Sequence, residues 1–205
     1  MINLPKLIGH RGVKNLSPEN TIESIKLAKE LRLDWVEFDV KVSKDLTPIL
    51  FHDDCLERII DVKGKPVEYN YSEIKKFDAG SFFFKNSTNI YIPTLEEVLL
   101  LCKNIDMNLN IELKPNKNFE KINVESIAKI LVNSNFPHHY YFSSFDLNSL
   151  IMMKELLPFS NYGLLVDKLD SKKNLNEIID ISLKYNFFCC GLNFDIITSE
   201  IINKI

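Results

Sequence analysis

Apolar and polar residues alternate most regularly over residues 35–41, and this pattern predicts a β-strand. The residues on its apolar face are Val36, Phe38 and Val40. The residues on its polar face are Glu37, Asp39 and Lys41. Side chains two residues apart on one face lie about 6–7 Å apart, so Glu37 and Asp39 repel each other unless a positive charge lies between them. Two interpretations stay open: an edge strand with a solvated polar face, or a site for a divalent cation with oxygen ligands.

The other apolar runs alternate between strand and helix periods, which is typical of a parallel α/β fold. Further strands are predicted at residues 7–10, 48–51, 109–114, 140–144, 162–166 and 188–193. Helices are predicted at residues 22–32, 71–74, 95–104, 124–134, 148–157 and 174–185, with the start of another at 198–205. This order predicts a TIM (β/α)8-type barrel that lacks its last strand and helix.

Local signals refine the element ends. Asn20 is the expected N-cap of the first helix, with Glu23 completing a capping box, and Thr94 with Glu97 forms a second capping box. Gly12 stands where a sharp turn or a close ligand would require glycine.

The link between residues 39 and 48 is too short for a helical crossover. A two-residue turn at Asp45 and Leu46 would pair Asp39 with His52 in a hairpin. A parallel strand over residues 48–51 would also end at His52. Either arrangement brings His52 close to Asp39.

Residues 54–92 have weaker periodicity, and we interpret them as an insertion over the barrel mouth within a single domain, residues 1–205. Residues 82–84 are three successive phenylalanines. We expect some of them to cover a cleft or to pack on the barrel, because a solvated loop would not expose so much apolar surface.

Composition supports one globular domain: the chain has 205 residues, 45% of them hydrophobic and 26% charged. The net charge is −3 with no basic stripe, which argues against nucleic-acid binding. No apolar run reaches the roughly 18 residues that span a bilayer, and the first residues lack the pattern of a signal peptide. We therefore expect a cytoplasmic protein without a transmembrane segment.

The four cysteines show neither a Cys-x-x-Cys pair nor zinc-ligand spacing, so we expect them to be small buried hydrophobic residues.

Polar residues that could bind a ligand or transfer a proton stand at the ends or on the polar faces of predicted strands. Glu112 is a candidate third oxygen ligand, and Lys114 is a candidate partner for a phosphate or a carboxylate. Arg11 follows His10 in a chain that has many more lysines than arginines, and a guanidinium binds phosphate in a fork that lysine cannot copy. Each histidine alone could be structural, but two histidines and three carboxylates at one rim favour chemistry.

These residues occur in a characteristic order. The segments are His10-Arg11-Gly12, Pro18-Glu19-Asn20-Thr21, Glu37-x-Asp39, His52-Asp53, Asp78-Ala79-Gly80, Ile92-Pro93-Thr94-Leu95-Glu96-Glu97, Glu112-Leu113-Lys114 and Ser143-Ser144-Phe145. The set resembles the glycerophosphodiester phosphodiesterase family, a branch of the phospholipase C-like phosphodiesterase barrels, over essentially the whole chain. Three features depart from the family: Leu46 replaces the usual turn glycine, the last strand is missing, and the segment around Asn193 matches loosely.

The resemblance implies that Glu37, Asp39 and Glu112 bind one divalent cation, Ca²⁺ or Mg²⁺, which agrees with the oxygen-only donor set. It implies that His10 and His52 are general acid and base, with the two roles unassigned.

The resemblance also gives Arg11 and Lys114 the substrate phosphate, while Glu19 and Asn20 are expected to fix the loop after the first strand.

The implied function is hydrolysis of glycerophosphodiesters to sn-glycerol 3-phosphate and an alcohol. One alternative is a related phosphodiesterase or lyase that acts on lysophospholipids. Another is a phosphate- or metal-binding protein without catalysis. The expected partner is a small-molecule substrate, and homo-oligomerisation is left open.

Overall fold

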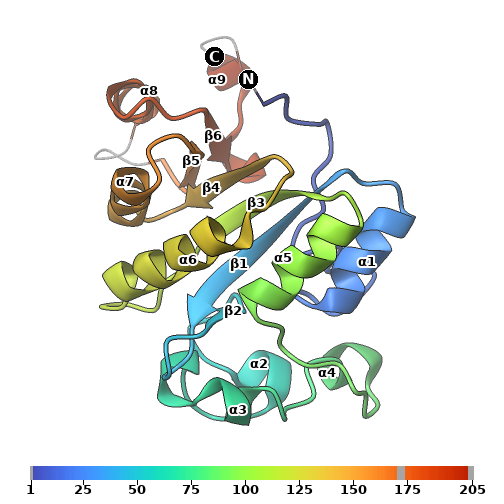
Figure 1. Ribbon diagram of the computed structural model, residues 1–205. Helices are drawn as coiled ribbons and strands as arrows, with labels where there is room; N and C mark the ends of the chain where they lie inside the picture. The colour runs from blue at the N-terminus through green and yellow to red at the C-terminus, as the bar shows by residue number, and fades with distance from the viewer. Residues whose placement is uncertain (1, 170–173, 203–205) are drawn as a thin grey trace.

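The computed structural model describes residues 2–169 and 174–202 (Figure 1). Its strands form one six-stranded sheet in the order β2-β1-β3-β4-β5-β6. The strands are β1 (Trp35–Val42), β2 (Pro48–Leu50), β3 (Asn108–Leu113), β4 (Tyr140–Ser144), β5 (Asn161–Val166) and β6 (Cys189–Leu192). β2 pairs antiparallel with β1, and the other neighbours pair in parallel. The predicted α/β barrel-type fold is confirmed, although no pairing joins β2 to β6 within the described residues.

Helices follow the strands in sequence and pack against the sheet, as α5 and α6 do in Figure 1. The helices are α1 (Ile22–Glu30), α2 (Glu57–Ile60), α3 (Tyr71–Ile74), α4 (Ser81–Phe84), α5 (Leu95–Asn104), α6 (Glu120–Ser134), α7 (Leu147–Leu156), α8 (Leu175–Lys184) and α9 (Ser199–Ile202). Two short 3-10 helices are η1 (Pro66–Glu68) and η2 (Phe194–Ile196). The expected final helix starts as predicted, and residues 203–205 lie outside the described residues.

The two helix starts predicted from capping residues have different outcomes. The box of Thr94 and Glu97 is confirmed, since Thr94 Oγ1 accepts from the Glu97 backbone and Glu97 accepts from the Thr94 backbone. At α1 the prediction is wrong by one residue: Thr21 caps the helix by accepting a hydrogen bond from Ser24 N at 3.2 Å. Asn20 has φ +56° and turns its side chain toward β1 instead.

The first predicted strand, residues 7–10, is largely absent. Gly9 alone pairs with Val36, donating to Trp35 O and accepting from Glu37 N. Leu7 is exposed, and Arg11 and Gly12 both have positive φ, which turns the chain away after a single bridge.

The hairpin between β1 and β2 is antiparallel, but its register differs by one residue from the prediction. Lys41 pairs with Ile49, not with residue 50. Ser43 N donates to Thr47 O, so the loop holds three residues and not two. Leu46 takes φ +61°, the left-handed position that ends such three-residue loops. His52 still follows β2 directly, as both predicted arrangements required.

Every residue of β1 is buried, so the solvated edge-strand interpretation is wrong. The apolar side of β1 packs with the helices in the main core, which includes Val36, Phe38 and Val40. The polar side faces the concave interior of the sheet, where Glu37 is 7% exposed and Asp39 and Lys41 are 0% exposed.

The segment 54–92 forms a second apolar cluster, with α2, α3 and α4 gathered beyond the arrowhead end of β1 in Figure 1. Phe82 packs on this cluster, while Phe84 is largely exposed. The division of the chain into a barrel and an insertion over its mouth stays a prediction.

The expectation for the cysteines holds only in part: Cys102 is buried, Cys189 is half-buried, and Cys55 and Cys190 are exposed. None of the described helices combines the length and the apolar character needed to cross a bilayer.

Candidate active site

A tight turn after Gly9 presents His10 and Arg11 to the polar face of β1. Arg11 has φ +51° and Gly12 has φ +78°. A Cβ on Gly12 would lie 2.3 Å from Ser24 Oγ on α1, so only glycine fits both the angle and the space. Gly12 N donates to Glu37 O at 3.0 Å, and Arg11 N donates to Glu37 Oε2 at 2.8 Å. The backbone of this turn therefore fixes one carboxylate.

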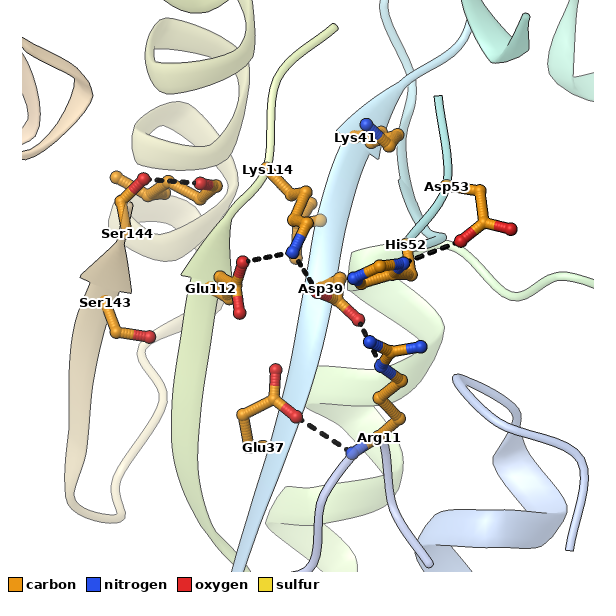
Figure 2. Close-up of polar contacts among 12 residues, drawn as sticks. Arg11, Glu37, Asp39, Lys41, His52, Asp53, Glu112, Lys114, Ser143 and Ser144 are labelled. Carbon is orange, nitrogen blue, oxygen red and sulfur yellow. Dashed lines mark hydrogen bonds and ion pairs between the residues drawn. The ribbon is translucent and has the colours of Figure 1, made fainter. Parts of the chain in front are cut away.

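Three carboxylates converge at the centre of the sheet, as Figure 2 shows. The parallel register places Asp39 directly opposite Glu112 on β3, and Glu37 lies two residues before Asp39 on the same face. One oxygen from each lies within 4.8 Å of the others. All three are buried, at 7%, 0% and 6% exposure for Glu37, Asp39 and Glu112.

Burial and mutual repulsion make this cluster costly when all three groups are charged. Burial, together with the charges of Asp39 and Glu112, raises the pKa of Glu37 well above its usual value. Burial and the Asp39 charge raise the pKa of Glu112 to about 7. Glu37 Oε1 and Asp39 Oδ1 are buried without a hydrogen-bond donor from the part of the chain that the structure describes. Buried acceptors of this kind are rare, and a divalent cation with oxygen ligands fits this donor set.

Two cations flank the carboxylates from opposite sides (Figure 2). Arg11 Nε lies 3.3 Å from Asp39 Oδ2, and Arg11 Nη1 donates to Glu19 Oε1 at 2.9 Å. Lys114 Nζ donates to Glu112 Oε1 at 2.7 Å and lies 3.5 Å from Asp39 Oδ1.

Asn20 supplies further support, because Asn20 Nδ2 donates to Asp39 Oδ2 at 2.9 Å and Asp39 N donates to Asn20 Oδ1 at 3.1 Å. These contacts agree with the expectation that Glu19 and Asn20 fix the loop after the first predicted strand.

The two histidines lie at the rim in different environments. His10 Nε2 lies 3.7 Å from Glu37 Oε2, and burial, with the charges of Lys14 and Arg11, lowers the pKa of His10 to about 4. His52 Nδ1 lies 2.6 Å from Asp53 Oδ1. Burial also lowers the pKa of His52, although the charge of Asp39 and the Asp53 hydrogen bond oppose the shift. Of these two histidines, His52 is the one whose described contacts include a carboxylate outside the cluster, that of Asp53.

These side chains open onto a cavity of about 720 Å³. Its polar wall, on and after β1 and β3, consists of Glu37, Asn110, Glu112 and Lys114. Its apolar wall, from β5 and β6, consists of Leu165, Val166 and Leu192, with Asp167 and Asn193 at the rim. His10, Arg11, His52, Phe145 and Gly191 complete the lining, and Asp39 lies beneath the polar wall. The fold thus gathers all seven sequence-predicted site residues in one place.

An aromatic layer closes the site from below. Trp35 shares the inward face of β1 with Glu37, and its ring centroid lies 5.9 Å from that of Tyr141. Tyr141 in turn lies 6.2 Å from Phe188. Trp35 and Tyr141 are both buried, so the start of β1 beside Glu37 is apolar and desolvated.

Several supporting residues were not identified from the sequence. Lys41 Nζ, fully buried, donates to Asp54 Oδ1 at 3.1 Å, and Asn116 donates to the same residue. A lysine on the polar face of a buried strand was the available signal, because such a charge requires a partner. Arg58 gave no such signal: it binds Asp53, five residues away, and Glu19, thirty-nine residues away, and no sequence pattern links the three.

The fold and the cavity together indicate an α/β barrel-type protein with a site that suits a divalent cation and a phosphate ester. Residues 10–186 match the model of the Glycerophosphoryl diester phosphodiesterase family, and the chain belongs to that family.

Several curated relatives carry the name glycerophosphodiester phosphodiesterase. The protein from Caldanaerobacter subterraneus subsp. tengcongensis is 36% identical over 159 residues, which cover 78% of this chain and 65% of the relative. The protein from Bacillus altitudinis is 33% identical over 157 residues, covering 76% and 64%. The chain therefore spans slightly less than two thirds of these relatives.

A phosphodiesterase from Oleispira antarctica, solved in complex with the product sn-glycerol-3-phosphate, has a similar structure. The TM-score is 0.90 and the identity 30%, and the match covers 98% of this chain and 80% of the other.

Proposed function

We propose that this protein hydrolyses glycerophosphodiesters to sn-glycerol 3-phosphate and an alcohol, with one divalent cation as cofactor. The observation that carries the proposal is the cluster of three buried carboxylates, two of them with an unpartnered oxygen, beside a cavity lined by two histidines, an arginine and a lysine.

Glu37, Asp39 and Glu112 would hold the cation, and oxygen ligands favour Ca²⁺ or Mg²⁺. When bound, such an ion supplies a Lewis acid that neutralises phosphate charge and orients the glycerol hydroxyls. It would also relieve the repulsion among the three carboxylates.

Arg11 and Lys114 would bind the phosphodiester. Both line the cavity and lie beside the carboxylates. Arg11 Nε faces Asp39 Oδ2 at 3.3 Å, and the guanidinium carries further N–H donors that suit a phosphate oxygen.

His10 and His52 would transfer the protons. One histidine takes the proton of the attacking hydroxyl, either of water or of the glycerol 2-hydroxyl, as its oxygen forms a bond to phosphorus. The bond to the leaving alcohol breaks, and the other histidine protonates the leaving oxygen. In the second case a cyclic phosphate forms and water opens it. Asp53 holds Nδ1 of His52, which leaves Nε2 for this chemistry.

The relatives support the reaction class: those from Caldanaerobacter subterraneus and Bacillus altitudinis are named glycerophosphodiester phosphodiesterase, and the Oleispira antarctica protein binds sn-glycerol-3-phosphate. An apolar run such as residues 82–84 would favour a lysophospholipid substrate, but these residues are not among those that line the cavity. The absence of nucleic-acid binding, the cytoplasmic location and the oligomeric state stay predictions.

The test is release of sn-glycerol 3-phosphate from glycerophosphocholine and glycerophosphoethanolamine, with lysophosphatidylcholine as a parallel substrate. His10→Ala and His52→Ala should each lower the rate by about 10²-fold or more, because each removes a proton-transfer group. His138→Ala is the matched control, since His138 is bonded to Lys103 O and does not line the cavity. If both cavity variants match the wild type, the acid–base assignment is wrong. If only lysophosphatidylcholine is cleaved, the substrate class is wrong.

A further inference from the structure

Arg58, in α2, joins the two loops that carry the histidines without itself lining the cavity. Its Nε and Nη2 donate to the two carboxylate oxygens of Asp53, the second bond at 3.0 Å. Its Nη1 and Nη2 donate to the two oxygens of Glu19, at 2.9 and 2.7 Å. One guanidinium therefore binds two carboxylates, each through two hydrogen bonds.

Each of these carboxylates also binds a residue that lines the cavity. Asp53 Oδ1 lies 2.6 Å from His52 Nδ1. Glu19 Oε1 accepts a hydrogen bond from Arg11 Nη1 at 2.9 Å. The chain of contacts thus runs from Arg11 through Glu19, Arg58 and Asp53 to His52.

The geometry of the two pairs requires a guanidinium. A planar fork offers two edges of parallel N–H donors, whereas an ammonium is a single point and cannot bind two carboxylates in this way. Glu19 is largely buried and fixed by Arg11 on its other side, so it is a firm anchor.

The charge of Asp53 is consistent with this arrangement. Burial opposes ionisation of Asp53, but hydrogen bonds with Arg58 and His52 lower its pKa to about 2. An ionised Asp53 accepts its hydrogen bond from His52, so Nδ1 carries the proton and Nε2 is free to take one.

We propose that Arg58 is a positioning residue: by tying Asp53 to the Glu19 anchor, it fixes the orientation and the tautomer of His52. This inference rests on the proposed function, in which His52 transfers a proton. The Arg58 side chain is 44% exposed. An ordinary ion pair at such an exposed position would have no effect on His52. Arg58 differs from such a pair because its two carboxylate partners each bind a residue that lines the cavity. Asp53 binds His52, and Glu19 binds Arg11.

The kinetic test compares Arg58→Gln and Arg58→Lys in the full chain. Arg58→Gln should lower kcat about 10- to 100-fold, the usual effect of losing a partner that orients a functional histidine. Arg58→Lys should recover only a small part of this loss, because it keeps the charge without the fork. Lys75→Gln is the matched control: it breaks an ion pair with Glu97, and its side chain is 47% exposed, but it lies away from the cavity lining.

A double variant separates positioning from a general loss of structure. If Arg58 acts through His52, adding Arg58→Gln to His52→Ala should lower the remaining rate by less than about threefold, because the two effects share one route. An equal loss in both backgrounds would show that Arg58 is merely structural and would overturn the inference.

A second readout does not depend on activity. Long-range ¹H–¹⁵N spectra of the imidazoles, with the His52 signals identified by their loss in His52→Ala, report which ring nitrogen is protonated. Wild type should show Nδ1 protonated, and Arg58→Gln should shift these signals toward a mixture of tautomers.

The two readouts separate the two claims. Unchanged His52 signals in Arg58→Gln would overturn the inference even if the wild type is active. Shifted His52 signals in a wild-type protein that cleaves none of the substrates would retain the positioning role and contradict the proposed function.

Discussion

The polar and apolar walls of the cavity belong to one sheet but differ in burial and in charge. In the polar wall, β1 is fully buried; Arg11 N, in the turn after Gly9, donates to Glu37, and Lys114, after β3, pairs with Asp39. In the apolar wall, β5 is mostly buried, but none of the residues of β6 is fully buried, and β6 lies at the edge of the described sheet. The polar wall therefore carries the charged groups, and the apolar wall shapes the cavity.

The difference follows from the cost of burying charge. A buried carboxylate is stable only when its neighbours compensate it, so functional groups concentrate where the sheet is best supported. The apolar wall needs only shape and tolerates exposure. Substitutions in the two walls should separate these tasks.

The largest effect is expected from Asp39→Asn. This change keeps the side-chain shape but removes the charge at the centre of the carboxylate cluster. Losing cation-based stabilisation worth several kcal/mol should lower kcat/KM by about 10³-fold or more. Initial rates of sn-glycerol 3-phosphate release at saturating Ca²⁺ or Mg²⁺ provide the measurement.

Asp167→Asn is the control on the rim of the apolar wall, since Asp167 lines the same cavity but is exposed. An exposed charge contributes about 0–1 kcal/mol, so the rate should stay within about fivefold of wild type. Equal losses for the two variants would remove the distinction between the walls.

The same truncation in the two halves of the sheet should differ in stability. Leu109 on β3 is completely buried, and Leu109→Ala should lower the free energy of unfolding by about 2–5 kcal/mol. Leu192 on β6 is only half-buried, so Leu192→Ala should cost less than about 1.5 kcal/mol. Urea unfolding followed by circular dichroism compares the two, and a larger loss for Leu192→Ala would reverse the proposed order.

A smaller effect is expected from pH in the metal-free protein. The pKa of Glu112 is raised in the folded protein to about 7 from the usual 4.5. Its contribution to stability is therefore complete below pH 4.5 and is lost as the pH rises through 7. A bound cation relieves this loss, so added Ca²⁺ or Mg²⁺ should raise the Tm more at pH 8 than at pH 5.5.

At a hundredfold excess over Kd the rise should be about 5–10 °C at pH 8. Thermal scans with and without EDTA measure it. The same scans on Asp39→Asn provide the control, and a larger rise at pH 5.5 than at pH 8 would exclude carboxylate ligation.

The convergence of the three carboxylates could be predicted from the sequence because strand alternation is a local signal. Glu37 and Asp39 share a face by the period of a strand, and Glu112 reaches them once β1 and β3 pair in parallel. The cap at Thr94 was equally local and was placed correctly.

Features set by tertiary contacts were predicted less well. The prediction of a first strand at residues 7–10 was wrong because positive φ at Arg11 and Gly12 ends the pairing at Gly9. The predicted hairpin register was wrong by one residue because Leu46 adopts a left-handed backbone conformation, which leucine does not favour. Asn20 was assigned to a cap because its actual partner, Asp39, is nineteen residues away.

The most direct test of the central claim is a metal add-back experiment on the wild-type protein. Chain stripped with EDTA should release no sn-glycerol 3-phosphate from glycerophosphocholine or glycerophosphoethanolamine, and Ca²⁺ or Mg²⁺ should restore release together with the Tm. Full activity of the stripped protein, with the metal content verified as absent, would contradict the account.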